Sequence, residues 1–488
     1  MSGLAVARRE TAAAAARGVA VRRGSVTASR LWPLLAATSV SAAFLLVAWL
    51  RYTTYHSDAY DLGFFDQAVW NAAQGHGLQS SFLAYPFLGQ HFEPALYLFV
   101  PLYRLHATPL WLLGAQSLAL GAAVVPLCAL ARRWLGAGWR PAIACAAYVL
   151  QVGVARAVGF DFHTEALAVP FVFLALLGAA RGDTWLLLLA GVMPMLCKED
   201  GALVTLGIAV IALLVHRRRA ALILAAVAVT GGALVVLVVM PHLRAGTPGD
   251  LVARYAYLGG TPGAVLVHAV TRPDLWLRHL VTAPAGPALL MALAGVAFLP
   301  LLRPATLLAA APALLLPLFA DDPYQGGLRL HYALQATPLL VCAAMLGWQR
   351  LALFARHRRG DVTAGALLAA ALAGWLALSP LPGGHGPDAT DLTGLDRAAH
   401  VDALLSRIPP NASVAATGDL LTHLAERPSI AEFPARRAAD WVAIDARAQI
   451  SAQSRAAGYA QSLAALRSRG YVRVASSDGV TLWRLPGR

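Results

Sequence analysis

The sequence is poor in lysine, in charged residues and in cysteine. Lys198 is the only lysine among 488 residues, and 13% of the residues are charged while 58% are hydrophobic. With a mean hydropathy of +0.60, the chain is too apolar for an ordinary soluble protein. The composition therefore predicts an α-helical polytopic membrane protein.

The few cysteines do not indicate a redox or metal site. All of them lie inside apolar segments and no two have CxxC spacing, so neither a disulfide framework nor a thiolate metal site is expected. The cysteines are Cys128, Cys145, Cys197 and Cys342.

The formal charge of +14 does not indicate a nucleic-acid-binding protein. Much of the excess arginine stands in short clusters between apolar runs, where basic residues set the orientation of membrane helices. Little basic surface is left for the phosphates of a nucleic acid. No nucleic-acid partner is therefore expected.

Long apolar runs are what the sequence does contain. Residues 1–30 form an arginine-rich tail that the positive-inside rule places in the cytoplasm, although an organelle transit peptide has a similar composition. The following run, 31–50, is long enough to cross a bilayer. Counting the later runs against the arginine clusters predicts about eleven transmembrane helices within residues 31–380.

Three central apolar runs, 166–180, 184–197 and 202–215, are shorter than a membrane span requires. They can form either three segments or fewer, bent ones. As three spans, they would place the connecting segments RGD and HRRR on the cytoplasmic side and KED on the exoplasmic side. The pattern of charges favours this arrangement and therefore three segments.

The segment 51–105 is predicted to be an exoplasmic loop, and it is crowded with aromatic residues, histidines and acids. If the segment is helical, Asp58 and Asp61 share one face at positions i and i+3. Two such carboxylates can bind a divalent cation, or raise one another's pKa so that one acts as a general base. The alternative is that they are solvated acids or helix caps.

Two further groups of polar residues are candidate ligands. His91 and Glu93 precede a short apolar segment, either as a metal-binding or proton-relay pair or as a polar lip that anchors the segment. Asp161, His163 and Glu165 alternate between two spans, which would put three metal ligands on one side of an extended loop.

Ionisable residues also appear where they are costly. Lys198 and Glu199 stand between two short apolar runs, where charged residues are usually paired. Arg254, Arg329 and His331 lie in later polar segments and are cationic candidates for a phosphate. For a single arginine the alternative is that its side chain snorkels to the membrane interface.

Residues 381–488 have the composition of a soluble domain of about 100 residues. Strands are expected at 413–417, 441–445, 471–475 and 480–485, with helices near 395–407 and 446–469. This alternation predicts a small α/β domain on the exoplasmic side. It contains no Gly-rich phosphate loop, so nucleotide binding is not expected.

Several motifs resemble the GT-C membrane glycosyltransferases, among them the protein mannosyltransferases and the lipid A aminoarabinose transferases. These enzymes have an acid after the first span and an aromatic residue four positions later, which correspond here to Asp61 and Phe65. They then have a glycine, here Gly75 or Gly77, and a charged residue before a proline, here Glu93-Pro94. From about residue 52 onward, YDLGFFDQAVWNAAQG, HFEP, DFHTEALAVP, KED and LRLHY resemble a family of bacterial multi-spanning membrane proteins distantly related to GT-C enzymes. Leu62 and Glu93 depart from the aminoarabinose transferases, which have Glu and Lys there.

The resemblance implies transfer of a sugar from a polyprenyl-phosphate donor to an exoplasmic acceptor, in the plasma (inner) membrane of a bacterium and among its membrane lipids. Asp61 would be the general base, with Asp58 and Asp161 as further catalytic acids. A divalent metal is optional in this superfamily, so the cofactor is left open. The substrate-binding residues would be His91, Glu93, His163, Lys198, Glu199, Arg254, Arg329 and His331.

Two other classes of function compete with an enzyme. A membrane transporter would also carry polar loops and buried charges, but no inverted repeat is visible and the acids concentrate at one face instead of at the midplane. The third class is a non-catalytic envelope scaffold whose outer domain binds a partner.

Overall fold

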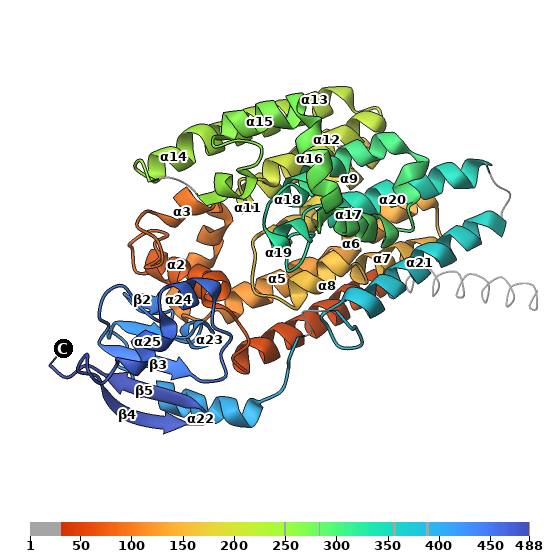
Figure 1. Cartoon of the computed structure of the whole chain (residues 1–488). Coiled ribbons are helices and arrows are strands. Elements are labelled where there is room, and N and C mark those ends of the chain that lie inside the picture. Colours follow the sequence, from red (N-terminus) through yellow and green to blue (C-terminus); the bar gives the residue numbers. More distant parts are fainter. Residues whose placement is uncertain (1–30, 248–249, 283, 355–357, 387–389, 488) are drawn as a thin grey trace, which may run out of the picture.

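The computed structural model describes residues 31–247, 250–282, 284–354, 358–386 and 390–487. A stack of helices carries a small α/β unit at one end (Figure 1). The expected class, a helical membrane protein with a small C-terminal α/β domain, is confirmed. The cytoplasmic tail expected at residues 1–30 lies outside the described residues.

In the described part of the chain, three helices are long and apolar enough to cross a membrane: Leu31–Thr53, Leu110–Leu135 and Arg218–Leu243. A bent pair, Arg140–Val149 and Val152–Val158, meets at 47°. With this pair and a second one, Pro273–Thr282 with Ala285–Ala294, up to five spans are present if each pair is one span. The total of about eleven spans remains a prediction.

The three central runs form separate helical segments, as their charges favour. They are α9 (Glu165–Arg181), α10 (Thr184–Val192) with α11 (Pro194–Cys197), and α12 (Gly201–Leu214). Close packing between them depends on glycine. A Cβ atom on Gly178 would lie 2.6 Å from the backbone nitrogen of Leu187, so a larger residue there would push α9 away from α10.

The largest hydrophobic core lies among these helices and their neighbours, and it includes the buried residues Leu127, Phe173, Ile208 and Trp348. The other helices are α5 (Leu110–Ala122), α6 (Val124–Leu135), α7 (Arg140–Val149), α8 (Val152–Val158), α13 (Arg218–Leu234), α14 (Met240–Leu243), α17 (Ala285–Ala294), α18 (Leu307–Leu318), α19 (Pro323–Gly326), α20 (Thr337–Phe354) and α21 (Arg358–Leu378).

The loop after the first helix is compact and has its own aromatic core, to which Phe65, Phe87, Phe99 and Phe162 contribute. Only short helices form here, so the apolar segment 94–105 does not make a span. The elements are η1 (Ala59–Gly63), α2 (Phe64–Ala73), α3 (Phe87–Gln90), η2 (Pro94–Phe99) and α4 (Val100–Leu105).

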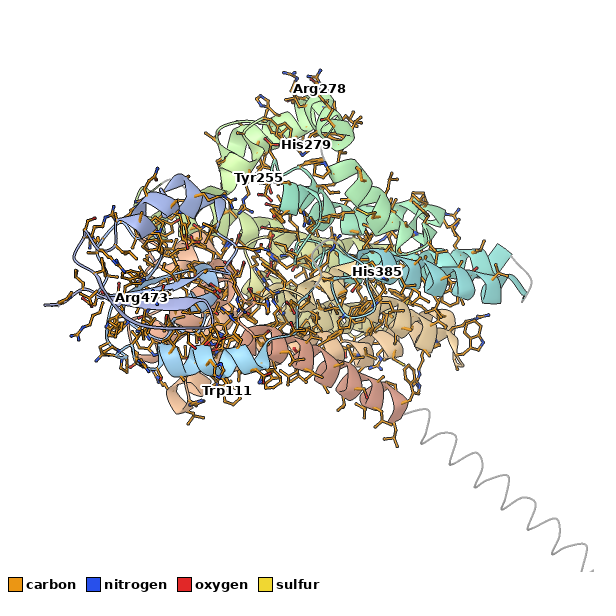
Figure 2. The ribbon with its side chains drawn as sticks, turned by 60° about the horizontal axis from the view of Figure 1, so that its bottom comes forward. Trp111, Tyr255, Arg278, His279, His385 and Arg473 are labelled. Carbon is orange, nitrogen blue, oxygen red and sulfur yellow. The ribbon has the colours of Figure 1, made fainter. Side chains whose placement is uncertain are left out.

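The segment after α14 also contains short helices. They are η4 (Asp250–Tyr255), α15 (Pro262–Thr271) and α16 (Pro273–Thr282). Val270 and Val281 are 81% and 82% exposed, which is expected of apolar side chains that face lipid. Figure 2 shows Arg278 and His279 on this projecting segment, away from the sheet that carries Arg473.

The C-terminal unit is a five-stranded sheet of order β2-β1-β3-β5-β4. β1 (Val414–Ala416) pairs in parallel with β2 (Ile430–Glu432) and β3 (Trp441–Asp445), while β5 (Val480–Arg484) runs antiparallel to β3 and to β4 (Val472–Ser477). The sequence did not predict β2. Its helices are α22 (Leu395–Leu405), α23 (Gly418–Leu421), α24 (Ala452–Ala456) and α25 (Tyr459–Ala464).

This unit docks on the loop that follows the first helix (Figure 1). The ring of His423 stacks on Tyr52 and Tyr55, with ring centroids 4.3 Å and 3.9 Å apart. Gln67 donates from Nε2 to the carbonyl oxygen of Arg427 at 3.1 Å. The parallel strands end against η1, because α23, which follows β1, packs on it.

Candidate functional site

The first carboxylate of the loop caps η1. Oδ1 of Asp58 accepts a hydrogen bond from the backbone N–H of Tyr60 at 2.8 Å, so the capping interpretation applies to this residue. Its side chain is exposed to solvent, yet the protein around it and the neighbouring charge of Asp61 raise the pKa of Asp58 to about 7. Asp58 therefore titrates near neutral pH.

Asp161 is buried beneath this cap. Its Oδ2 atom accepts a hydrogen bond from the backbone N–H of Asp58 at 2.7 Å, and its Oδ1 atom lies 3.5 Å from Nε of Arg51. Burial raises the pKa of Asp161, while the Arg51 guanidinium acts in the opposite direction. Asp161 thus connects the end of the first helix to the start of η1.

Asp61 projects from η1 toward a histidine. Its Oδ1 atom lies 3.3 Å from Nε2 of His163, and 26% of the Asp61 side chain is exposed against 6% of the His163 side chain. The backbone N–H of His163 donates to Oε1 of Gln116 at 2.9 Å. The amide of Gln116 in turn donates to the carbonyl oxygen of Asp161 at 3.3 Å, which holds this turn in place.

A continuous series of contacts leads from this histidine to an arginine. The rings of His163 and His331 are stacked, with centroids 3.4 Å apart and planes at 18°. His331 lies against Tyr332 at 4.2 Å between ring centroids, and Nη1 of Arg254 lies 3.4 Å from the hydroxyl of Tyr332. Arg254 also donates to Oε1 of Gln325 at 2.6 Å.

Lys198 and Glu199 of the KED segment are paired, while Asp200 accepts a hydrogen bond from Nε2 of Gln335 at 2.6 Å. Nζ of Lys198 lies 2.5 Å from Oε1 of Glu165, and His331 Nε2 lies 3.9 Å from the same oxygen. Nδ1 of His91 lies 3.1 Å from Oε1 of Glu199. These pairs compensate charges that burial would otherwise make costly.

With this geometry established, comparison with known proteins shows the family. The model of a family described as "Predicted membrane protein (DUF2079)" matches residues 51–482. The chain belongs to this family. Among curated proteins, no sequence matches it.

A solved structure that resembles the DUF2079 protein is the crystal structure of ArnT from Cupriavidus metallidurans bound to undecaprenyl phosphate. The sequences are 12% identical, and the alignment covers 92% of this chain and 98% of that chain with a TM-score of 0.48.

The structure brings most of the predicted site residues together. Asp58, Asp61 and Asp161 meet at η1, and His163, His331 and Arg254 continue from there, whereas His91 and Glu199 form a separate pair. Glu93 is 1% exposed and lies near Glu165 and Lys198. The guanidinium of Arg329 lies 4.7 Å from the ring centroid of Tyr324.

The metal site suggested by Asp161, His163 and Glu165 does not form. Asp161 faces Arg51, His163 faces Asp61 and Glu165 faces Lys198, because the turn is not extended and Glu165 already begins α9. Within the described residues, no group of three or more His, Cys, Asp or Glu side chains is placed to hold a metal ion.

Sequence reasoning missed three residues of the site. Arg51 ends the first apolar run, where an arginine is ordinarily read as snorkelling. Gln116 is a lone amide inside an apolar run. Polar side chains in such helices usually have a hydrogen-bond partner, so this position could have been recognised from the sequence as a structural or functional contact. Tyr332 gives no signal in the sequence beyond its place in LRLHY.

Proposed function

We propose that the DUF2079 protein is a membrane glycosyltransferase that moves a sugar from a polyprenyl-phosphate donor to an exoplasmic acceptor. The observation that carries the proposal is the contact between Asp61 and His163, which presents a partly exposed carboxylate on η1. Asp161, paired with Arg51, holds the start of η1, the element that carries Asp61. A supported carboxylate that solvent can reach is suited to general base catalysis.

In the proposed reaction, Asp61 accepts the proton of an acceptor hydroxyl while the hydroxyl oxygen forms a bond to the anomeric carbon of the sugar. The bond from that carbon to the phosphate oxygen breaks, and its electron pair stays with the polyprenyl phosphate. The leaving phosphate gains negative charge, so a cation near it would stabilise the transition state.

Arg254 is our candidate for that cation. It stands at the other end of the contacts that begin at Asp61 and pass through His163, His331 and Tyr332. A sugar phosphate lying along these rings would have its acceptor side at Asp61 and its phosphate at Arg254. Lys198 is already paired with Glu165, which makes it a weaker candidate.

The C-terminal domain is proposed to select the acceptor. Its parallel strands end at η1, and a Cβ atom on Gly418 would lie 3.5 Å from Oδ2 of Asp58. The edge of a parallel sheet at its carboxyl ends is where α/β domains commonly bind ligands. Gly418→Val should therefore raise the KM for the acceptor and leave the KM for the donor unchanged.

The test is to measure sugar transfer from a polyprenyl-phosphate donor in membranes that contain the wild-type protein, the Asp61→Asn variant or a matched control variant. Asp66→Asn is the control, because Asp66 is a buried aspartate of the next helix, α2, and accepts a hydrogen bond from the hydroxyl of Tyr103 at 2.7 Å. We expect Asp61→Asn to lower kcat by roughly 10²-fold or more. Substrate uptake without sugar transfer would instead support a transporter. The absence of both uptake and transfer would support a scaffold.

We also propose that the N-terminus is cytoplasmic, that the C-terminal domain is exoplasmic and that the membrane is the bacterial inner membrane. All four native cysteines are buried, so an introduced cysteine can be labelled selectively. A membrane-impermeant thiol reagent should label Asn411→Cys in intact cells and should not label Arg181→Cys. Both positions are exposed, and the opposite pattern would reverse the orientation.

A further inference from the structure

His163 stands between two hydrogen-bond acceptors. Its Nδ1 atom lies 3.2 Å from the carbonyl oxygen of Asp161, and its Nε2 atom lies 3.3 Å from Oδ1 of Asp61. A carbonyl oxygen can only accept, so Nδ1 must carry a proton for the first contact. In a neutral imidazole, the lone pair on Nε2 would then face an ionised carboxylate.

Two protonation states remove that repulsion. In one, Nε2 is also protonated and an imidazolium faces an ionised Asp61. In the other, Asp61 is protonated and donates to a neutral His163. Both states contain one proton more than an ionised aspartate beside a neutral histidine, and both leave the pair without net charge.

The surroundings decide where that proton lies. The charged and titratable groups around the pair are Asp58, Arg51, Asp161, Glu165, Lys198, His331 and Tyr332, with His91 and Arg254 farther away. Lys198 and Glu165 compensate one another, as do Arg51 and Asp161. Asp58, an additional carboxylate close to Asp61, favours a proton on Asp61, whereas the stacked ring of His331 favours that proton on His163.

His331 is the neutral partner in this arrangement. Its burial, and after that the neighbouring His163, hold the pKa of His331 well below its usual range. The two rings lie face to face at 3.4 Å between centroids. An imidazolium stacked on a neutral aromatic ring is favourable, whereas two stacked cations would repel.

We propose that Asp61 and His163 share one proton in the resting protein, with His163 as the imidazolium, and that His163 is a positioning residue for Asp61. The imidazolium occupies Oδ1 and leaves Oδ2 to meet the acceptor hydroxyl. This catalytic consequence rests on the proposed function, while the shared proton does not.

The shared proton also balances charge during transfer. When Oδ2 of Asp61 takes the acceptor proton, the pair changes from neutral to one positive charge. At the same step the donor phosphate gains one negative charge as its bond to the sugar breaks. The positive charge therefore appears in the site as the negative charge develops.

Nitrogen-15 NMR of the full-length protein in nanodiscs, labelled on histidine, tests the shared proton directly. The signal that is missing from His163→Gln belongs to His163. We expect both of its ring nitrogens to be protonated at neutral pH in the wild type, and the ring to become neutral in Asp61→Asn. His91 is paired with Glu199, so its signal is the matched control and should not respond to Asp61→Asn.

A neutral His163 ring in the wild type would overturn the proposal, and so would an imidazolium that persists in Asp61→Asn. The pH profile of sugar transfer gives the second measurement. His163→Gln keeps an N–H group beside Asp61 but cannot carry charge, so the alkaline fall in kcat that accompanies loss of the imidazolium proton should disappear. A purely structural role would lower kcat equally at every pH. An imidazolium without sugar transfer from any donor would support the shared proton and contradict only the proposed function.

Discussion

The backbone N–H of Asp58 donates a hydrogen bond of 2.7 Å to Oδ2 of Asp161, a residue 103 positions later in the chain. This bond joins the start of η1 to the turn between α8 and α9. Because Asp61 lies on η1 and His163 lies on that turn, the contact between them depends on Asp161. Asp161 therefore acts on the site through the backbone that it holds.

Replacing Asp161 should consequently affect folding as well as activity. Asp161→Ala leaves Arg51 and the N–H of Asp58 without their buried partner, and breaking a buried ion pair costs roughly 3–5 kcal/mol. Asp161→Asn retains an oxygen for Asp58 and should be milder. Thermal unfolding in detergent, together with kcat for sugar transfer, measures both effects. Equal melting temperatures for Asp161→Ala and wild type would contradict this role.

The Lys198–Glu165 pair should behave as a buried ion pair. Lys198→Ala alone leaves the Glu165 carboxylate uncompensated, and we expect a loss of roughly 3–5 kcal/mol in the free energy of unfolding. A double variant, Lys198→Met with Glu165→Leu, removes both charges and should be closer to wild type. A double variant as unstable as Lys198→Ala would argue against charge pairing as the cause.

His423 should anchor the C-terminal domain. Its ring stacks on Tyr52 and Tyr55, and two such stacked pairs are worth about 1–3 kcal/mol together. Burial lowers the pKa of His423 to about 4, so this contact should not change across the neutral pH range. His423→Ala should make the linker before the domain more sensitive to protease. His400→Ala, at an exposed histidine of the same domain, is the control.

Asp419 should make stability depend on pH. Burial, followed by the neighbouring Asp445, raises the pKa of Asp419 to about 8. The folded protein then holds a proton that the unfolded chain releases at about pH 4, so stability falls as pH rises from about 4 to about 8. Asp419→Asn should raise the melting temperature above that window and leave it unchanged below. A wild-type melting temperature that is constant across the window would contradict this.

Part of the C-terminal fold was predictable and part was not. The strands β3 and β5 have runs of β-branched and aromatic residues that are long enough to recognise. β2 has three residues, Ile430–Glu432, which is too short for an alternating pattern to be distinguished from a loop. It forms because β1 offers it a parallel edge, and that edge exists only in the folded sheet.

The sequence by itself determined that this is a polytopic membrane protein with a small C-terminal α/β domain, because apolar runs and arginine clusters act through their composition and do not require contacts. It also pointed to acids and histidines as candidates for the site. Only the tertiary structure decided their partners: Asp161 with Arg51, Asp61 with His163 and Glu165 with Lys198. The physical reason is that a pair of charges forms where helix packing brings the two side chains within a few ångströms, and sequence spacing does not encode that packing.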